Sequence, residues 1–370
     1  MMGANTDDFS RLEINLEGCL QNYRYFRSRL KDSTKMLVLV KANAYGHGAV
    51  EFASIMEKAG ADYLAVAYPV EGTELRKAGI RLPIMVLTSG TDFFNEIVDN
   101  ALEPGIPNLY TLKALCKILA ERGIKDYPVH IKLDTGMHRL GFMTSELGEL
   151  SEFLSDCPFV RVKSVYSHLA AAEDPESDDF SLGQVRMFMR NADSLSSALG
   201  YRPLYHILNS AGIERFPQYQ FDMVRLGIGI YGVSALEGVS LAPVASFKCK
   251  ILQIKHLEPE DGTIGYGRHG KISPSGTTIA TIPVGYADGI DRHLGCGRCS
   301  FMLNGKRVPT IGNICMDMCM LDITGVEAAV GDTVTIFGEE PTIGELASIL
   351  GTIPYEILTS VPRRIERVVL

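Results

Sequence analysis

The chain has 370 residues, of which 46% are hydrophobic and 22% charged, and its formal net charge is −8. Because a single core rarely grows beyond about 250–300 residues, this length predicts a globular protein with more than one domain. The acidic balance without a basic stripe argues against a nucleic-acid partner, and no apolar run reaches the ~20 residues that a membrane helix needs.

The N-terminal residues MMGANTDDFS are polar and acidic. They lack the basic and then apolar plan of a secretory signal, which favours a cytoplasmic location. The eight cysteines are then expected to be reduced thiols. The spacing Cys296-x-x-Cys299 with Cys315-x-x-x-Cys319 fits no common zinc-ligand pattern, so we expect no metal site.

Short apolar runs alternate with amphipathic helical patterns from about residue 12 to 235. Runs that are apolar on both strand faces are typical of parallel strands covered on both sides. Eight such strands, each followed by a helical stretch, predict an N-terminal (β/α)8 TIM-like barrel over residues 11–240, although an open doubly wound sheet has the same local pattern. The candidate strands lie at residues 36–40, 63–66, 84–87, 107–109, 129–133, 162–165, 206–208 and 228–230.

After about Leu241 the pattern changes to short strands separated by turns. Asn304-Gly305 between two apolar segments is a strong hairpin signal. Residues 241–370 are therefore predicted to form a second, mostly antiparallel β domain, on which residues 1–10 could pack.

Lys41 stands at the end of the first candidate strand, after five apolar residues. Chemistry gathers at the C-terminal ends of the strands in a βα barrel. Apolar surroundings would destabilise the lysine ammonium, and a neutral amine can attack an aldehyde. The competing interpretation, favoured by composition alone, is a lysine that extends from a strand end into water.

A series of motifs in one order along the chain resembles the alanine racemase family. The series begins with Val40–Gly48 (VKANAYGHG), which resembles the pyridoxal-phosphate lysine motif of that family. It continues through Lys132–Gly141, Ser167-His168, Asn209-Ser210-Ala211, Asp222–Arg225 with Gly227, Gly285–Gly289, Cys315-Met316-Asp317 and Pro354-Tyr355-Glu356. The resemblance implies a homodimeric racemase that interconverts L- and D-alanine with pyridoxal 5'-phosphate and supplies D-alanine for bacterial peptidoglycan.

The resemblance assigns the two acid/base groups to Lys41 and Tyr266. Lys41 is implied to form the Schiff base with the cofactor and then to move the α-proton on one face of the substrate. Tyr266 is implied to act on the other face, from the smaller domain of the partner subunit. A free tyrosine has a pKa near 10, so it would need a hydrogen-bond partner or a nearby cation. Without the resemblance, Tyr266 would be an aromatic residue that closes a hairpin.

Arg225 is implied to face the ring nitrogen of the cofactor, and His168 to orient Arg225. An arginine cannot accept a proton, so the ring nitrogen would stay unprotonated and side reactions such as transamination would be suppressed. Taken alone, Arg225 could instead form a strand-end salt bridge with Asp222, and His168 could be an ordinary core histidine.

The cofactor phosphate is implied to be held by residues from three parts of the chain. They are Tyr45, Ser210, Tyr355 and the backbone of Gly227 and Ile228. Barrel phosphate sites often form from the loops after strands seven and eight, which is where Ser210 and Gly227 lie in the predicted barrel.

Arg139 is implied to contact the phenolic oxygen of the cofactor and the substrate carboxylate. Strand alternation places His130, Lys132 and Asp134 on one face, which predicts an inward-facing Lys132. The family often carries a carbamylated lysine there, so we expect this modification on Lys132. Two further residues are implied to complete the substrate site, the backbone amide of Met316 at the carboxylate and Tyr286 at the entrance.

The chain departs from the family pattern at Leu226 (usually proline), at Met318 (often glutamine) and in a shorter run over residues 359–366. None of these removes a catalytic group. The alternative within the family is a serine racemase or a racemase of broader specificity, against which Tyr355 speaks. From other classes, a pyridoxal-phosphate carrier or homeostasis protein lacks the β domain, and a barrel decarboxylase would be expected to have an acidic residue in place of Arg225.

Overall fold

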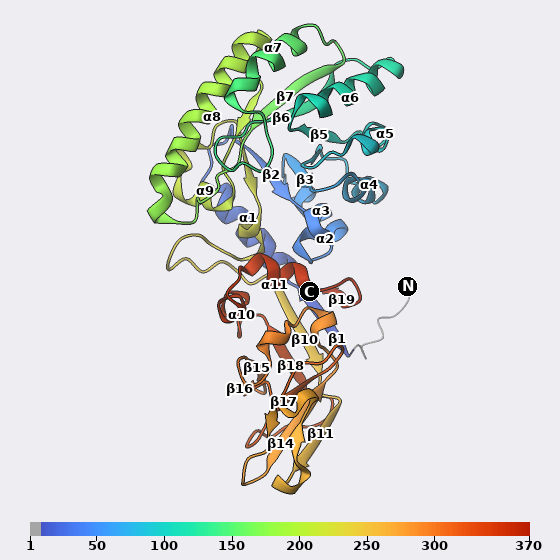
Figure 1. Ribbon diagram of the computed structural model, residues 1–370, viewed down its shortest axis with the longest axis vertical. Coiled ribbons are helices and arrows are strands. Elements are labelled where there is room, and N and C mark those ends of the chain that lie inside the picture. Colours follow the sequence, from blue (N-terminus) through green and yellow to red (C-terminus); the bar gives the residue numbers. More distant parts are fainter. Residues whose placement is uncertain (1–8) are drawn as a thin grey trace. The chain divides into compact units, whose positions relative to one another are not determined.

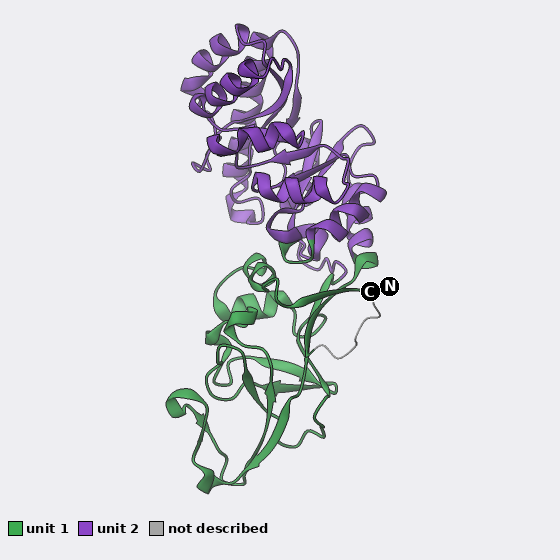
Figure 2. Ribbon diagram, turned by 90° about the vertical axis from the view of Figure 1, so that its right-hand side faces the viewer, with its two compact units in different colours: residues 1–18, 45–48, 243–370 green, residues 19–44, 49–242 purple. Residues whose placement is uncertain are grey.

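The computed structural model describes residues 9–370. The chain divides into two compact units (Figure 2). We call residues 19–44 and 49–242 the barrel unit. Residues 45–48, residues 243–370 and the described residues up to Gly18 make up the β unit.

Eight parallel strands form the sheet of the barrel unit. Their order is β8-β7-β6-β5-β4-β3-β2-β9, so the last strand returns to pair with the first. Backbone hydrogen bonds from Asp222 to Tyr205 and from Arg225 to Leu208 connect the β9 and β8 segments and close the ring. The predicted (β/α)8 barrel is therefore confirmed, and an open sheet is excluded. The strands are β2 (Lys35–Leu39), β3 (Tyr63–Val66), β4 (Ile84–Val86), β5 (Glu103–Ile106), β6 (Tyr127–Lys132), β7 (Val160–Tyr166), β8 (Leu204–His206) and β9 (Met223–Leu226).

Two strands lie earlier in the chain than the sequence predicts. Strand β5 ends at Ile106 because Asn108 caps the next helix, its side chain accepting a hydrogen bond from the Thr111 amide. Strand β9 ends at Leu226, and the segment Ile228–Tyr231 is a short 3-10 turn. In both places an apolar run continues past the strand into a buried turn or helix, which periodicity alone does not separate from a strand.

The helices of the barrel unit cover the outside of the sheet (Figure 1). Their apolar faces are buried, as in α6, where Leu112, Leu115 and Leu119 are fully buried at helical spacing. The helices after the first strand of the barrel are α3 (Ala49–Lys58), α4 (Pro69–Lys77), α5 (Phe94–Asp99), α6 (Leu109–Glu121), α7 (Leu147–Ser155), α8 (Asp178–Leu199) and α9 (Ser210–Arg215); α1 (Leu16–Arg27) precedes it.

The β unit contains the mostly antiparallel sheet structure that the sequence predicts. A six-stranded sheet has the order β16-β15-β18-β10-β1-β19, and only β1 and β19 pair in parallel. Its strands are β1 (Ser10–Ile14), β10 (Ala245–Lys250), β15 (Ser300–Leu303), β16 (Lys306–Pro309), β18 (Thr333–Phe337) and β19 (Glu366–Val369). The Asn304-Gly305 turn joins β15 to β16, with both residues at positive φ (48° and 75°).

Smaller elements complete the β unit. A three-stranded sheet contains β11 (Gln253–Leu257), β14 (Thr277–Ile282) and β17 (Cys319–Asp322). Strands β12 (Thr263–Ile264) and β13 (Gly270–Lys271) form a two-stranded ribbon, and two helices follow, α10 (Ile343–Leu350) and α11 (Pro354–Ser360).

The N-terminal strand belongs to the β unit. Strand β1 pairs with β10 and β19, so residues 10–14 lie in this unit, whereas the sequence predicts that the barrel begins at residue 11. Within the β unit, the Phe9 carbonyl accepts a hydrogen bond from the Lys250 amide, and Ser10 pairs with Cys249. Residues 1–8 lie outside the described part of the chain.

Candidate active site

Lys41 follows strand β2 and begins the turn α2 (Lys41–Tyr45), which is left-handed. Ala42, Asn43 and Ala44 have φ values of 51°, 55° and 51°. Such a conformation costs about 1–2 kcal/mol per non-glycine residue, so it persists only where surrounding contacts hold it. Glu71 provides one of these contacts, because its carboxylate accepts a hydrogen bond from the Ala42 amide at 2.5 Å. The strained turn fixes Lys41 at the C-terminal end of the strand.

The site around Lys41 holds an excess of positive charge. Burial lowers the pKa of Lys41, and Arg139 lowers it further, while Glu71 acts in the opposite direction. Burial likewise lowers the pKa of Lys132 to about 8, with further contributions from Arg139, Arg225 and Lys41. Both amines are therefore easier to deprotonate than an exposed lysine, and the arrangement is complementary to an anionic ligand.

Lys132 points into the barrel, as strand alternation predicts. Its side chain is buried at the end of β6, and Nζ lies 5.9 Å from the centroid of the Tyr166 ring. The Arg225 guanidinium carbon lies 5.6 Å from the same centroid. The two cations thus share one aromatic neighbour in the barrel interior.

Arg225 is buried in strand β9, and its hydrogen-bond acceptors within residues 9–370 are neutral. Nη2 donates to the Ser167 carbonyl (2.6 Å), the Ile207 carbonyl (3.0 Å) and His168 Nδ1 (3.2 Å). Burial lowers the pKa of Arg225 to about 10. The interpretation of Arg225 as a salt bridge to Asp222 is wrong, because Asp222 pairs with Arg202 at 2.8 Å.

His168 faces Arg225 as a neutral acceptor. Burial holds its pKa well below the ordinary value, and Arg225 and Arg139 lower it further. A guanidinium has only N–H donors, so Nδ1 of His168 must be unprotonated where it meets Arg225.

Ser210 lies against the turn after β9. Its hydroxyl oxygen accepts from the Gly227 amide (2.9 Å) and the Gly229 amide (3.1 Å). A Cβ on Gly229 would lie 2.3 Å from the Phe26 ring, so the tight approach of this turn requires glycine. Ser210, Gly227 and Ile228 therefore come together after the seventh and eighth barrel strands.

Within the β unit, Tyr45 and Tyr355 lie side by side. Their ring centroids are 5.9 Å apart. Tyr45 is buried, which raises its pKa, and Tyr355 stands in the first turn of α11. A Cβ on Gly46 would lie 2.5 Å from the Leu358 carbonyl, so close packing of α11 places the two tyrosines together.

Tyr266, Tyr286 and Met316 line one pocket of the β unit, with a volume of about 540 Å³. Tyr266 occupies a 3-10 turn between β12 and β13, and its side chain is 72% exposed. The Tyr286 amide donates to the Cys315 carbonyl at 3.0 Å, which ties the two segments together. The three residues assigned to the substrate side of the site are thus neighbours.

Sequence reasoning missed several residues that meet Arg225 and Lys41. His206 accepts from Arg225 Nη1 through its Nδ1 at 3.0 Å, and Glu71 supports the turn after Lys41. Tyr166 stacks on His206 at 5.2 Å. Their position in the strands could have indicated a role, because Tyr166 and His206 are the last residues of two barrel strands. Active-site residues of such barrels lie at the C-terminal ends of the strands.

Comparisons with known proteins match both units. A family model described as "Alanine racemase, N-terminal domain" matches residues 14–235, and one described as "Alanine racemase, C-terminal domain" matches residues 244–369. The chain belongs to the alanine racemase family. The resemblance seen in the sequence is confirmed, and the second match excludes a barrel-only carrier protein.

Relatives in the alanine racemase family align over nearly the whole chain. "Alanine racemase 2" of Caldanaerobacter subterraneus subsp. tengcongensis is 36% identical, with 97% of this chain and 94% of the relative covered. "Alanine racemase" of Clostridium kluyveri is 37% identical, with 96% and 92% covered. Among solved structures, alanine racemase of Clostridium difficile 630 has a TM-score of 0.92 at 34% identity, covering 99% of this chain and 97% of that one.

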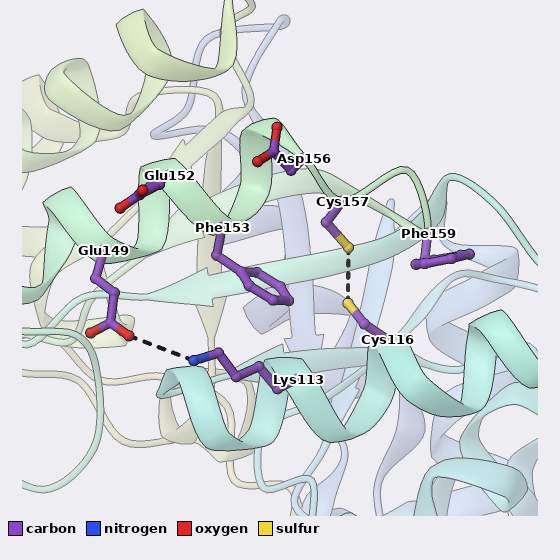
Figure 3. A pocket seen from close by; sticks show the side chains of 8 residues that line it. All are labelled: Lys113, Cys116, Glu149, Glu152, Phe153, Asp156, Cys157 and Phe159. Atoms are coloured by element: carbon purple, nitrogen blue, oxygen red, sulfur yellow. Dashed lines mark hydrogen bonds and ion pairs between the residues drawn. The ribbon is translucent and has the colours of Figure 1, made fainter.

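A pocket of about 360 Å³ lies between α6 and α7, apart from the residues assigned to the racemase site (Figure 3). Its lining includes Lys113, which pairs with Glu149 at 3.6 Å. Cys116 Sγ and Cys157 Sγ lie 3.1 Å apart in it, and all eight cysteines are free.

Residues 9–370 contain no cluster of three His, Cys, Asp or Glu that could hold a metal ion, and no helix long and apolar enough to cross a membrane.

Proposed function

We propose that the protein interconverts L- and D-alanine with pyridoxal 5'-phosphate as cofactor, in the bacterial cytoplasm, and supplies D-alanine for peptidoglycan. Family membership supports the racemase activity. The proposal is carried by the surroundings of Lys41, a half-buried amine of lowered pKa beside Arg139 and Lys132. The barrel would bind the cofactor, and the C-terminal β domain would supply the second proton-transfer group.

The residues present fit this cofactor. Pyridoxal phosphate carries an aldehyde, a phosphate, a phenolic oxygen and a ring nitrogen, and its negative charge suits the cationic side chains Arg139 and Arg225 beside the two lysines. Lys41 would hold the aldehyde carbon, Arg139 the phenolic oxygen and Arg225 the ring nitrogen. The phosphate would be held by Tyr45, Ser210, Tyr355 and the backbone of Gly227 and Ile228. When bound, the group withdraws electrons from the substrate Cα and so acidifies its α-proton.

Proton transfer is assigned to two residues on opposite sides of the substrate. The Lys41 amine takes or returns the α-proton on one side, helped by its lowered pKa. The Tyr266 hydroxyl does so on the other side, from the partner subunit of a homodimer. The high exposure of Tyr266 in a single chain supports this role, because a residue that completes a partner's site must be accessible before assembly.

Arg225 is assigned to limit side reactions. Its guanidinium can donate but not accept, so it leaves the ring nitrogen without a proton. His168 acts through Arg225 as a positioning residue, since its Nδ1 accepts from Nη2 at 3.2 Å.

The substrate carboxylate is assigned to Arg139 and the backbone amide of Met316, and the entrance to Tyr286. Tyr355 is assigned to bound the pocket for the substrate side chain, which supports alanine as the substrate.

Replacing Tyr355 with serine should raise kcat/KM for L-serine relative to L-alanine by roughly tenfold, because a smaller polar residue leaves room for the hydroxyl of the substrate. Racemisation of both amino acids measures this ratio. Tyr110→Ser, which changes a tyrosine that is 74% exposed on α6, should leave it unchanged.

We expect a carbamate on Lys132. Carbon dioxide adds to a neutral amine, and a pKa of about 8 makes the neutral form of Lys132 accessible near neutral pH. Since the pKa is lowered, the neutral fraction rises with pH through about 8, and occupancy should fall as the pH drops below that value. With ¹³C-bicarbonate, the full-length protein should show a carbamate resonance that Lys132→Arg lacks. A bicarbonate-free preparation with unchanged activity and no added mass on Lys132 would contradict the assignment.

The first test of the activity follows the loss of optical activity of L-alanine, with L-serine in parallel, in the protein purified with pyridoxal phosphate. Fast alanine and slow serine turnover support the proposal. Comparable serine turnover would favour a racemase of broader specificity. A yellow, cofactor-loaded protein that racemises neither would refute the reaction and favour a decarboxylase.

A further inference from the structure

A continuous chain of side-chain hydrogen bonds crosses the interior of the barrel and ends on Arg225. The Glu103 carboxylate lies 2.9 Å from His130 Nε2, and His130 Nδ1 lies 2.6 Å from Ser164 Oγ. Ser164 Oγ is 2.8 Å from His206 Nε2, and His206 Nδ1 is 3.0 Å from Arg225 Nη1. The five residues come from five successive strands, β5 to β9.

With both imidazoles neutral and Glu103 ionised, only one direction of hydrogen bonding satisfies every member of this hydrogen-bond chain. Arg225 has N–H donors and no acceptor, so His206 Nδ1 must accept and the ring proton of His206 must be on Nε2. That proton is donated to Ser164 Oγ, which leaves the Ser164 hydroxyl proton free for His130 Nδ1. His130 then carries its own proton on Nε2 and donates it to the Glu103 carboxylate. Neither end can reverse, because a carboxylate has no proton to give.

The hydrogen-bond chain is buried in the interior of the barrel, which excludes water from it. His130, Ser164 and His206 have no exposed surface, and only 13% of the Glu103 side chain is exposed. Tyr166 stacks on His206 with an angle of 14° between the rings. A charged group at each end strengthens such a chain, and in a low dielectric each hydrogen bond polarises the next.

We propose that Glu103, His130 and Ser164 are positioning residues that fix His206 as an acceptor and so hold the Arg225 guanidinium in one orientation toward the cofactor ring nitrogen. This inference rests on the proposed function. Within residues 9–370, no carboxylate forms a hydrogen bond or ion pair with Arg225 directly. The hydrogen-bond chain instead connects Arg225 to the Glu103 carboxylate through four successive hydrogen bonds. The residues at the far end would thus act on the reaction without touching substrate or cofactor.

Cutting the chain at its centre should release Arg225. Ser164→Ala removes the acceptor for His206 and the donor for His130, so either ring can change tautomer or turn. In the cofactor-loaded protein we expect kcat/KM for alanine to fall roughly tenfold, the scale of disrupting the hydrogen bond between His206 and the charged Arg225 guanidinium. We also expect the fraction of turnovers that end in transamination, seen as pyruvate, to rise. Glu103→Gln, which removes only the charge, should shift both quantities in the same direction by less.

The matched control is Ser181→Ala. Ser181 is also a fully buried serine of the barrel unit, in helix α8, and its hydroxyl has no hydrogen-bond partner among the described residues. This variant removes the same atom from the interior without breaking the chain, so it should retain the wild-type partition between racemisation and transamination.

A second measurement tests the chain without any turnover. Long-range ¹H–¹⁵N correlation spectra of the full-length protein labelled with ¹⁵N-histidine, with and without pyridoxal phosphate, report which nitrogen of each ring is protonated. We expect Nε2–H for both His206 and His130, and a changed signal for both in Ser164→Ala but not in Ser181→Ala. A proton on Nδ1 of His206, or spectra and product ratios in which Ser164→Ala matches Ser181→Ala, would overturn the inference. A wild-type protein that fails to racemise alanine would instead count against the proposed function. The histidine spectra would then still test whether the hydrogen-bond chain has the proposed direction.

Discussion

Replacing Lys41 with alanine should reduce alanine racemisation by about 10⁴-fold or more, because one side chain supplies both the covalent attachment and a proton-transfer group. The lowered pKa of Lys41 is what suits it to these tasks. The decisive measurement is racemisation together with peptide mapping after borohydride reduction, which should find the cofactor on Lys41 in the wild-type protein and on no residue in the variant.

Lys132 is the main competitor in this experiment, since it is buried and has a lowered pKa of about 8. Mapping of the cofactor to Lys132 in the wild-type protein would overturn the assignment of Lys41. Lys117→Ala, which changes an exposed lysine of α6, provides the control for purification and folding. Retention of most activity by Lys41→Ala would leave the family and fold standing and refute the role of this lysine.

The barrel could be predicted because its determinants are local. Each strand is a short apolar run at a regular distance from an amphipathic helix. This alternation still predicts the barrel although the positions of two strands were predicted wrongly. The N-terminal strand could not be assigned to its unit in this way. Its partners β10 and β19 lie more than two hundred residues away in the chain, and no local pattern of residues 10–14 specifies that pairing.

The candidate site was predictable only where a motif carries it. Lys41 follows a barrel strand, where active-site residues are common, but its left-handed turn depends on Glu71, which lies 29 residues after Ala42. Glu103, His130 and Ser164 each resemble ordinary strand residues. Hydrogen bonds connect these three residues to His206 and Arg225 only when five successive strands lie side by side in the barrel. The connection is therefore a property of the tertiary structure.

Replacing Tyr266 with phenylalanine should lower racemisation by about 10²–10⁴-fold, the usual contribution of one acid/base group, while cofactor binding persists. The phenol is exposed and lies in the β unit, whereas Lys41 lies in the barrel unit. If Tyr266 serves the partner's site, a mixed dimer of one Lys41→Ala subunit and one Tyr266→Phe subunit contains one wholly native site and one doubly damaged site. Random mixing in equal amounts should therefore restore about one quarter of wild-type activity from two nearly inactive proteins.

The matched control mixes Lys41→Ala with Arg225→Ala. Both residues belong to the barrel unit, so every site in the mixed dimer lacks one of them and no activity should return. Restoration in the first mixture alone places Tyr266 in the partner's site. If neither mixture regains activity although mass spectrometry detects mixed dimers, Tyr266 acts within its own chain, and an active monomer would then be expected. The experiment thus separates the identity of the second acid/base group from the subunit that supplies it, since the loss in Tyr266→Phe tests the first and the mixed dimer tests the second.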